Sequence, residues 1–250
     1  MKRILNIVPV PVPKEALTSF AAQIPAAATF PGFENVFVAA KAGAGVIDSP
    51  YEQALSDTFV LDAGARAEEL GYDGVVVNSM SDSALAALRS RLRIPVVAPS
   101  QASMLTACLL GKRFSVITMW PQWHSLYTKA ATTEGITHRL ASIRDIGVRP
   151  DAEQLLAGKE DFVFDALLTQ CRAAIDEDGA DVLILGSTTM HQSHAWLSER
   201  LEVPILNPGV IAYKLCETLV LLGQSHSKKA YPSPDKPQDS LFDPVAGLFR

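Results

Sequence analysis

Two serines, Ser79 and Ser187, lie at the same point of a segment that occurs twice in the chain. Residues 71–95 and 179–204 each open with Gly-x-Asp, continue through an uninterrupted aliphatic run into a small polar loop, and close with Arg-Leu-x-(Ile/Val)-Pro. Such a run without alternation is typical of a strand covered on both faces, as in a parallel sheet. Open α/β sheets bind ligands at the carboxyl ends of their strands. The repeat therefore predicts two similar halves that place the two serines on opposite walls of one cleft.

Further hydroxyl groups surround both serines. Ser81 follows Ser79, and Thr188 and Thr189 follow Ser187. Hydroxyl and backbone N–H groups at the amino end of a helix bind a carboxylate well, so these residues are predicted to form an anion-binding set. The alternative is that they only cap the helices that follow them.

Three nearby residues could act as general acid or base. His191 and His194 begin the helix expected after Ser187, and imidazole titrates near neutral pH. Asp82 could serve as a base or orient a donor. The alternatives are that the histidines lie on the helix surface and that Asp82 caps the following helix. The aromatic residues Trp120 and Tyr127 follow another strand, where they could form a wall for the substrate or belong to the core.

Strands and helices alternate along the chain, which predicts a doubly wound α/β protein with parallel sheets. Residues 1–98 with 208–223 are expected to form one lobe and residues 99–207 a second, pseudo-symmetric lobe, with an active-site cleft between them. Residues 224–250 contain several prolines and few apolar clusters, which indicates an extended tail across the surface or a neighbouring subunit. The strands are expected at 4–8, 36–40, 74–78, 95–97, 114–118, 138–143, 182–186 and 204–206. The helices are expected at 14–24, 52–70, 83–92, 100–110, 121–134, 159–177, 191–200 and 209–222, with Gly111 as a left-handed cap.

Composition excludes several classes of protein. The formal net charge is −5 and no basic run occurs, which argues against a nucleic acid partner. No apolar stretch approaches the roughly 20 residues that span a bilayer, and prolines interrupt the first apolar run, so we expect no membrane segment and no signal peptide. Cys108, Cys171 and Cys216 are widely spaced in apolar contexts. They are predicted to be reduced core residues of a cytoplasmic protein, and their spacing predicts no metal site.

The paired strand–loop units, the run Gly-Ala-Asp-Val-Leu-Ile-Leu-Gly at 179–186 and the segment 223–232 resemble the aspartate/glutamate/hydantoin racemase superfamily, most of all its hydantoin racemase branch. The resemblance implies two pseudo-symmetric lobes, one catalytic cysteine at a strand end in each lobe, and catalysis without a cofactor. It also implies a role for a tyrosine near 127 in holding a carboxylate, as in the branch that decarboxylates malonates. Members are commonly oligomeric, so a homo-oligomer is expected.

The chain departs from the superfamily at the positions that matter most. Ser79 stands where the first cysteine belongs in Cys-Phe-Gly-Asp-Pro-Gly-Leu, and Ser187 replaces the second in Gly-Cys-x-x-Met. Pro9, where hydantoin racemases have Asn-Pro-Asn, begins a more apolar rim. A cysteine thiolate can take a proton, whereas serine has no comparable anion near neutral pH without a neighbouring base. His191 or Asp82 is therefore expected to replace the thiols.

Three functions are open at this point. The first is a racemase or epimerase for a small carboxylated or hydantoin-type substrate with a carboxylate or cyclic amide. The second is a decarboxylase or hydrolase whose Ser/Thr donors stabilise an enolate or oxyanion. The third is a noncatalytic protein that binds a small molecule. The serines are either natural divergence or an engineered replacement of two cysteines.

Overall fold

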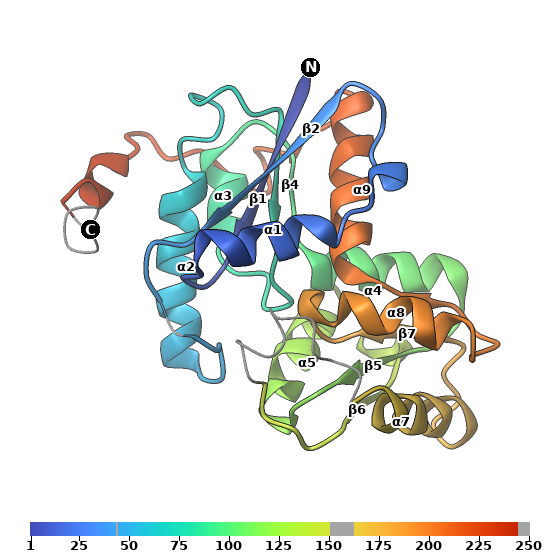
Figure 1. Ribbon diagram of the computed structural model, residues 1–250. Coiled ribbons are helices and arrows are strands. Elements are labelled where there is room, and N and C mark those ends of the chain that lie inside the picture. Colours follow the sequence, from blue (N-terminus) through green and yellow to red (C-terminus); the bar gives the residue numbers. More distant parts are fainter. Residues whose placement is uncertain (44, 151–162, 245–250) are drawn as a thin grey trace.

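Two parallel sheets of identical topology form the protein (Figure 1). The structure is a computed structural model that describes residues 1–43, 45–150 and 163–244. The first sheet has the strand order β2-β1-β3-β4 and the second has the order β6-β5-β7-β8, and all described pairs are parallel. The prediction of two α/β lobes with parallel sheets is confirmed.

The strands fall where the aliphatic runs predicted them, within a few residues at each end. They are β1 (Lys2–Val8), β2 (Phe33–Ala39), β3 (Gly74–Val77), β4 (Val96–Val97), β5 (Phe114–Thr118), β6 (Leu140–Asp145), β7 (Val182–Leu185) and β8 (Ile205–Leu206). The longer helices are α1 (Lys14–Ala22), α2 (Pro50–Gly64), α3 (Leu85–Arg91), α4 (Pro99–Leu110), α5 (His124–Thr133), α7 (Phe164–Asp176), α8 (His191–Ser198) and α9 (Pro208–Leu221). The helix expected over 52–70 begins at Pro50, because the Ser49 hydroxyl accepts the N–H of Glu52, and it ends at Gly64.

The Gly-x-Asp opening of each repeat performs the same task in both lobes. The Asp73 carboxylate accepts the N–H of Arg3 at the start of β1, and the Asp181 carboxylate accepts the N–H groups of Lys112 and Arg113 before β5. The glycines before them, Gly71 and Gly179, have φ values of +78° and +70°. Side chains other than glycine rarely adopt such angles, which explains why both repeats open with this residue. The sequence repeat is therefore a structural repeat.

Both faces of each sheet are covered, as continuous aliphatic strands require. In the first lobe, Leu5 and Val75 pack beneath α2 and α3, while Ile4 and Val76 point to the other face and pack against α9. In the second lobe, the strands pack on one face against α7 and α8 and on the other face against α4 and α5. Helices α4 and α9 also pack against each other, so the two lobes share an apolar contact.

Gly111 ends α4, but not as the left-handed cap that was predicted. Its φ is −150°, which is extended backbone. A Cβ atom at this position would clash with the side chains of Asp181 and Val182. The close approach of the Asp181 carboxylate, which holds the start of β5, is what requires a glycine here.

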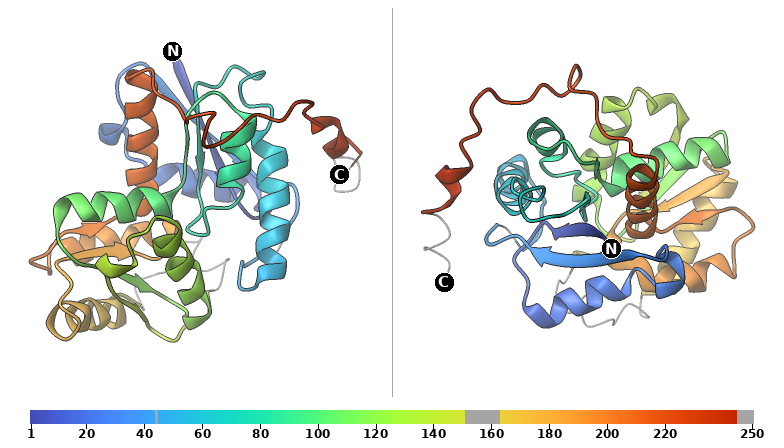
Figure 2. Two further views of the ribbon diagram at one scale, coloured as in Figure 1. Left: turned by 180° about the vertical axis from the view of Figure 1, so that it is seen from behind. Right: turned by 90° about the horizontal axis from the view of Figure 1, so that it is seen from above.

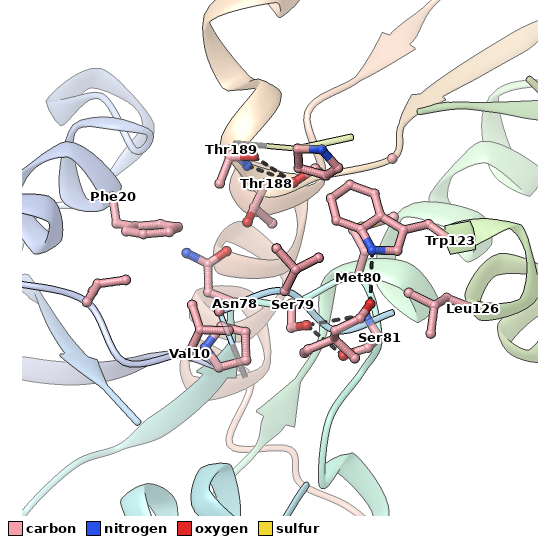
Figure 3. A pocket seen from close by; sticks show the side chains of 18 of the residues that line it. Val10, Phe20, Asn78, Ser79, Met80, Ser81, Trp123, Leu126, Thr188 and Thr189 are labelled. Atoms are coloured by element: carbon pink, nitrogen blue, oxygen red, sulfur yellow. Dashed lines mark hydrogen bonds between the residues drawn. The ribbon is translucent and has the colours of Figure 1, made fainter. Parts of the chain in front are cut away.

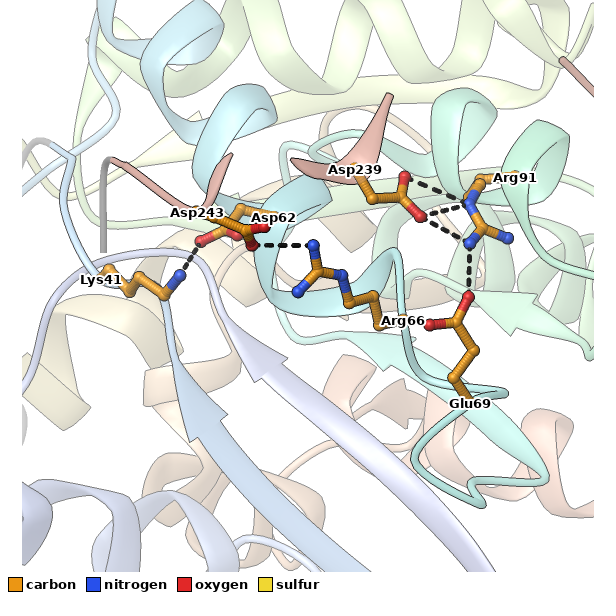
Figure 4. Close-up of polar contacts among 7 residues, drawn as sticks. All are labelled: Lys41, Asp62, Arg66, Glu69, Arg91, Asp239 and Asp243. Carbon is orange, nitrogen blue, oxygen red and sulfur yellow. Dashed lines mark hydrogen bonds and ion pairs between the residues drawn. The ribbon is translucent and has the colours of Figure 1, made fainter. Parts of the chain in front are cut away.

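The tail crosses the surface of the first lobe (Figure 2). The Lys228 ammonium donates to the carbonyl oxygens of Arg89, Ser90 and Leu92 at the end of α3. Asp239 binds Arg91 and Asp243 binds Arg66, so two tail carboxylates pair with arginines of the lobe (Figure 4). The described tail is thus anchored on its own chain. The lobe boundaries and a further contact of the tail with a neighbouring subunit stay predictions. No helix among the described residues is long and apolar enough to cross a membrane.

Candidate active site

A cavity of about 310 Å³ opens between the carboxyl ends of the strands of the two sheets (Figure 3). Ser79 lies two residues beyond the end of β3, and Ser187 lies two residues beyond the end of β7. Both serines line the cavity, with Ser81, Thr188 and Thr189 beside them. Because β3 and β7 hold equivalent places in the two sheets, the repeated segments meet across one cavity.

The two serines have the same local hydrogen bonds. Ser79 Oγ accepts the N–H of Ser81 at 3.3 Å and bonds its hydroxyl at 2.7 Å. Ser187 Oγ accepts the N–H of Thr189 at 3.2 Å and bonds its hydroxyl at 2.8 Å. In both cases a hydroxyl two residues further on holds the serine, so each serine is oriented by its own loop.

The rest of the cavity wall is mostly apolar and carries no charge. Pro9 lines it, as predicted for the rim, and the described lining residues include no Asp, Glu, Lys, Arg, His or Cys. The apolar lining side chains are those of Pro9, Val10, Pro11, Val12, Pro13, Phe20, Val46, Ile47, Met80, Trp123, Leu126 and Pro150. An uncharged wall of this kind accepts the apolar substituent of a small molecule, while the hydroxyl groups fix its polar part.

Tyr127 lines the cavity, but its hydroxyl group is bound within the protein. It donates to the carbonyl oxygen of Gly186 at 2.6 Å and lies 2.9 Å from the Thr118 hydroxyl. Burial raises the pKa of Tyr127, so its hydroxyl stays protonated. Because Gly186 directly precedes Ser187, Tyr127 positions the loop that carries the serine.

Trp123 lines the cavity, whereas Trp120, the tryptophan named as a candidate for the wall, does not. Trp120 is not among the lining residues; Arg149 lies over its ring at 5.6 Å, and the ring packs edge-on against Trp123. Trp123, at the end of the short helix η2 (Pro121–Trp123), lines the cavity, and its indole N–H donates to the carbonyl oxygen of Ile47 at 2.9 Å. This bond joins η2 of the second lobe to the loop of the first lobe that contains Ile47.

Asp82 points away from the cavity. Its two carboxylate oxygens accept the N–H groups of Ser100 and Gln101 at 2.9 and 3.0 Å, so it caps α4, not the helix that follows it in sequence. Its backbone has a φ of +49°, which turns the side chain toward α4. Burial raises the pKa of Asp82 to about 7, although both backbone donors act in the opposite direction. Direct contact with a substrate in this cavity is therefore not its role.

The sequence profile of the Asp/Glu/Hydantoin racemase family matches residues 15–216. This chain belongs to that family. The hydantoin racemase of Pseudomonas sp. (strain NS671) is 32% identical over 204 residues, which cover 80% of each of the two sequences. Among solved structures, allantoin racemase from Klebsiella pneumoniae has a TM-score of 0.84 at 27% identity and covers 95% of both chains. Allantoin racemase from Pseudomonas fluorescens has a TM-score of 0.82 at 28% identity, with 94% and 98% covered. The chain is accordingly an enzyme of the racemase class.

The histidines of this racemase-family chain do not line the cavity. His191 is partly buried at the start of α8, where burial lowers its pKa, and its Nδ1 has no hydrogen-bond partner among the described residues. Nε2 of His194 lies 2.9 Å from the carbonyl oxygen of Ile205, so this ring faces the sheet rather than the helix surface. Neither imidazole is placed to exchange a proton directly with a substrate between the serines.

The resemblance implies two catalytic cysteines, but none of the three cysteines of this chain lines the cavity. Cys171 and Cys216 are fully buried in the cores of the second and first lobes. Burial raises the pKa of Cys171 to about 12, so its thiol stays protonated at neutral pH. Cys108, on α4, is partly buried and packs against the core of the second lobe. Cys171 and Cys216 match the prediction of core cysteines, whereas Cys108 packs at the edge of a core.

The cavity is also lined by Asn78, Phe20 and Trp123, which were not among the site residues predicted from the sequence. Asn78 is 3% exposed, and its side-chain oxygen has no hydrogen-bond partner in the described part of the chain. It directly precedes Ser79, so a polar residue at a strand end was the available signal. An unpaired buried acceptor beside the serine is suited to an N–H group of a ligand. The described ranges hold no group of three or more His, Cys, Asp or Glu residues that could bind a metal.

Proposed function

We propose that this enzyme inverts the configuration at the α-carbon of a small hydantoin-type or carboxylated molecule, without a cofactor, between Ser79 and Ser187. The single observation that supports this most is the placement of the two serines at equivalent strand ends on opposite sides of one cavity. Racemisation needs groups on both faces of the carbon, because the proton leaves one face and returns to the other. The allantoin and hydantoin racemases to which the chain is similar act on cyclic ureides by name.

The cavity suits a neutral cyclic amide with an apolar substituent. Its volume of about 310 Å³ is at the lower end of ligand sites, and its wall is largely apolar. The Asn78 oxygen can accept a ring N–H, while the hydroxyls of Ser79 and Ser187 can donate to the oxygen that becomes negatively charged when the proton leaves. In this scheme the serines stabilise an enolate by hydrogen bonding and do not hold the charge themselves.

Decarboxylation is the second candidate, and one observation favours it. The described lining residues include no side chain that titrates near neutral pH. Loss of carbon dioxide leaves its electron pair on the α-carbon, so it needs hydroxyl donors to stabilise the enolate and one proton at the end, but no base at the start. The Ser/Thr cluster supplies such donors.

Incubation with 5-benzylhydantoin and phenylmalonate in deuterium oxide, followed by NMR, tests both candidates. Deuterium at the α-carbon of the hydantoin with inversion of configuration, above the spontaneous exchange, is the expected result. Release of carbon dioxide from the malonate alone would establish the lyase instead. In the racemase case, Ser187→Ala should lower turnover by about 10²-fold, the usual effect of losing one such donor. Unchanged ligand affinity and turnover in Ser187→Ala would contradict the assignment of the site.

A further inference from the structure

A line of hydroxyl groups runs from Ser79 into the protein. Ser79 Oγ lies 2.7 Å from Ser81 Oγ, which lies 2.6 Å from Ser83 Oγ, which lies 2.8 Å from Ser56 Oγ. Ser56 donates in turn to the carbonyl oxygen of Pro9 at 3.4 Å. We call Ser79, Ser81, Ser83 and Ser56 the hydroxyl chain; Figure 3 shows its first two members beside the cavity. Each hydroxyl can donate to one neighbour and accept from the other, so the hydrogens can reverse direction together.

Ser81 also reaches a second cavity. This cavity has a volume of about 380 Å³ and shares only Ser81 and Leu126 with the first. Unlike the first cavity, it is lined by charged side chains, which are those of Asp57, Asp82, Arg89, Lys129 and Glu134. The Ser79–Ser81 pair thus connects a cavity without titratable groups to one that contains carboxylates, with room for water.

We propose that Ser79 and Ser81 relay the substrate's α-proton between the two cavities. The inference rests on the proposed function, since it states where the proton goes in that reaction. As the C–H bond breaks, its proton binds Ser79 Oγ while the hydroxyl proton of Ser79 passes to Ser81 Oγ. The hydroxyl proton of Ser81 passes to water in the second cavity and from there to the carboxylate of Asp57 or Asp82. The C–H electron pair stays on the substrate as an enolate. Reversal of the same movement returns a solvent-derived proton to the face that the first proton left, so the relay exchanges the α-hydrogen with retention, and inversion needs a proton delivered from the opposite face.

A relay resolves the chemical problem that the two serines raise. A serine hydroxyl cannot hold the negative charge near neutral pH, so Ser79 can accept a proton only while it gives one away. The Oγ–Oγ distances within the hydroxyl chain, 2.7 Å from Ser79 to Ser81 and 2.6 Å from Ser81 to Ser83, are suited to such a concerted transfer. A raised pKa of about 7, caused by burial, makes the Asp82 carboxyl able to take up and release a proton near neutrality.

Ser83 and Ser56 act as positioning residues in this arrangement. Both are buried, and neither lines either cavity. Ser83 Oγ also accepts a hydrogen bond from the side-chain amide of Gln53 at 3.3 Å, whose other bond goes to Asp57 at 2.7 Å. These contacts hold Ser81 in place between its two hydroxyl neighbours.

The opposite wall lacks an equivalent path in the described part of the chain. Ser187 Oγ bonds the hydroxyl of Thr189, and both residues line the first cavity. A proton on that wall therefore stays within the cavity. The two faces of the α-carbon should differ in how fast they exchange hydrogen with solvent.

The test is α-hydrogen exchange of each enantiomer of 5-benzylhydantoin in deuterium oxide, followed by NMR for wild type, Ser81→Ala and Ser81→Thr. We expect Ser81→Ala to lower the kcat of exchange by about 10²-fold, as for loss of a proton-transfer group. Its KM should stay within about threefold, because in this scheme Ser79 and Ser187, and not Ser81, bond the substrate. Ser81→Thr keeps a hydroxyl group and should restore exchange. Ser115→Ala is the matched control, since it removes a partly buried Ser–Ser bond of 2.8 Å to Ser142 that lies in neither cavity.

Two results would overturn the relay while the proposed function stands: Ser81→Ala exchanging at the wild-type rate, or Ser81→Ala and Ser81→Thr being equally slow. If Ser81→Ala does not fold, Ser81→Val against Ser81→Thr gives the same comparison at equal size, with the same criteria. Absence of exchange by the wild-type enzyme would overturn the proposed function and the relay with it.

Discussion

Ser79 and Ser187 are related by the internal repeat of the molecule: each follows the equivalent strand of its sheet by two residues, and each accepts the N–H of the residue two positions later. Their loops differ in what lies behind them, because only the loop of Ser79 continues into buried hydroxyl groups within the described residues. The two walls of the site therefore have the same backbone arrangement but different hydrogen-bonded hydroxyl groups behind them. Any reaction on it should treat the two faces of a substrate differently.

Restoring thiols at the two serines should increase racemisation. In the double variant Ser79→Cys with Ser187→Cys, each cysteine has an ordinary pKa near 8.5, so a thiolate becomes available as base. We expect the rate with 5-benzylhydantoin to rise by about tenfold or more between pH 7 and 9. The control is Ser115→Cys on β5, which should change nothing. A double variant no faster than wild type would mean that these positions do not meet the α-carbon.

Removing the Tyr127 hydroxyl should destabilise the protein and disturb the Ser187 loop. Tyr127→Phe leaves the carbonyl oxygen of Gly186 without its donor at a buried site. We expect the free energy of unfolding to fall by about 1–2 kcal/mol, measured by denaturant unfolding. Turnover should fall as well, because the loop carries Ser187. Tyr51→Phe, at a residue that is 74% exposed, is the control and should match wild type.

The indole N–H of Trp123 should contribute to substrate affinity. Trp123→Phe keeps an aromatic ring in the cavity wall but removes the bond to the carbonyl oxygen of Ile47 that joins the two lobes. Loss of one hydrogen bond of the free protein should lower the free energy of unfolding by about 1 kcal/mol, and the less firmly held wall should raise KM more than it lowers kcat. Trp196→Phe, on α8 against Phe164, removes an indole outside the cavity and serves as control. A lowered kcat with unchanged KM would contradict this account of Trp123.

Lowering the pH should weaken the contact that His226 makes between the tail and the first lobe. Its Nε2 accepts the N–H of Val96 at 2.8 Å, which requires a neutral ring. Burial, together with the charges of Arg89 and Lys228, lowers the pKa of His226 to about 4. A pKa that is lower in the folded than in the unfolded state stabilises the protein above about pH 6.5, and this contribution is lost between pH 6.5 and pH 4.

Because the His226 ring is partly exposed to solvent, the effect on stability is smaller than the pKa change alone implies. We expect the free energy of unfolding to fall by about 1–2 kcal/mol over that pH range. His226→Gln keeps an acceptor that does not titrate, so its unfolding free energy should depend less on pH. Denaturant unfolding of both proteins at several pH values between 4 and 7 provides the measurement. Identical pH dependence of the two would show that His226 does not control the docking of the tail.

The two-lobed parallel fold and the pair of strand ends at the site could be predicted from the amino-acid sequence. Unbroken aliphatic runs require strands covered on both faces, and the repeat of Gly-x-Asp, strand and polar loop required the two halves to be alike. Pro9, Ser81, Tyr127, Thr188 and Thr189 line the cavity because the loops after parallel strands gather at one edge.

The directions in which the neighbouring side chains point depend on the packing of the folded protein and could not be predicted. Asp82 lies close to Ser79 and Ser81 in sequence, but its left-handed backbone angle directs its side chain toward α4. Trp123 and not Trp120 lies in the cavity wall, because its indole is directed at Ile47. The contact of Ser83 with Ser56, which are 27 residues apart, depends on how α2 packs against the loop after β3. Local spacing predicts which residues share an edge or a helix face, whereas rotation at a loop and contacts between distant elements arise from packing.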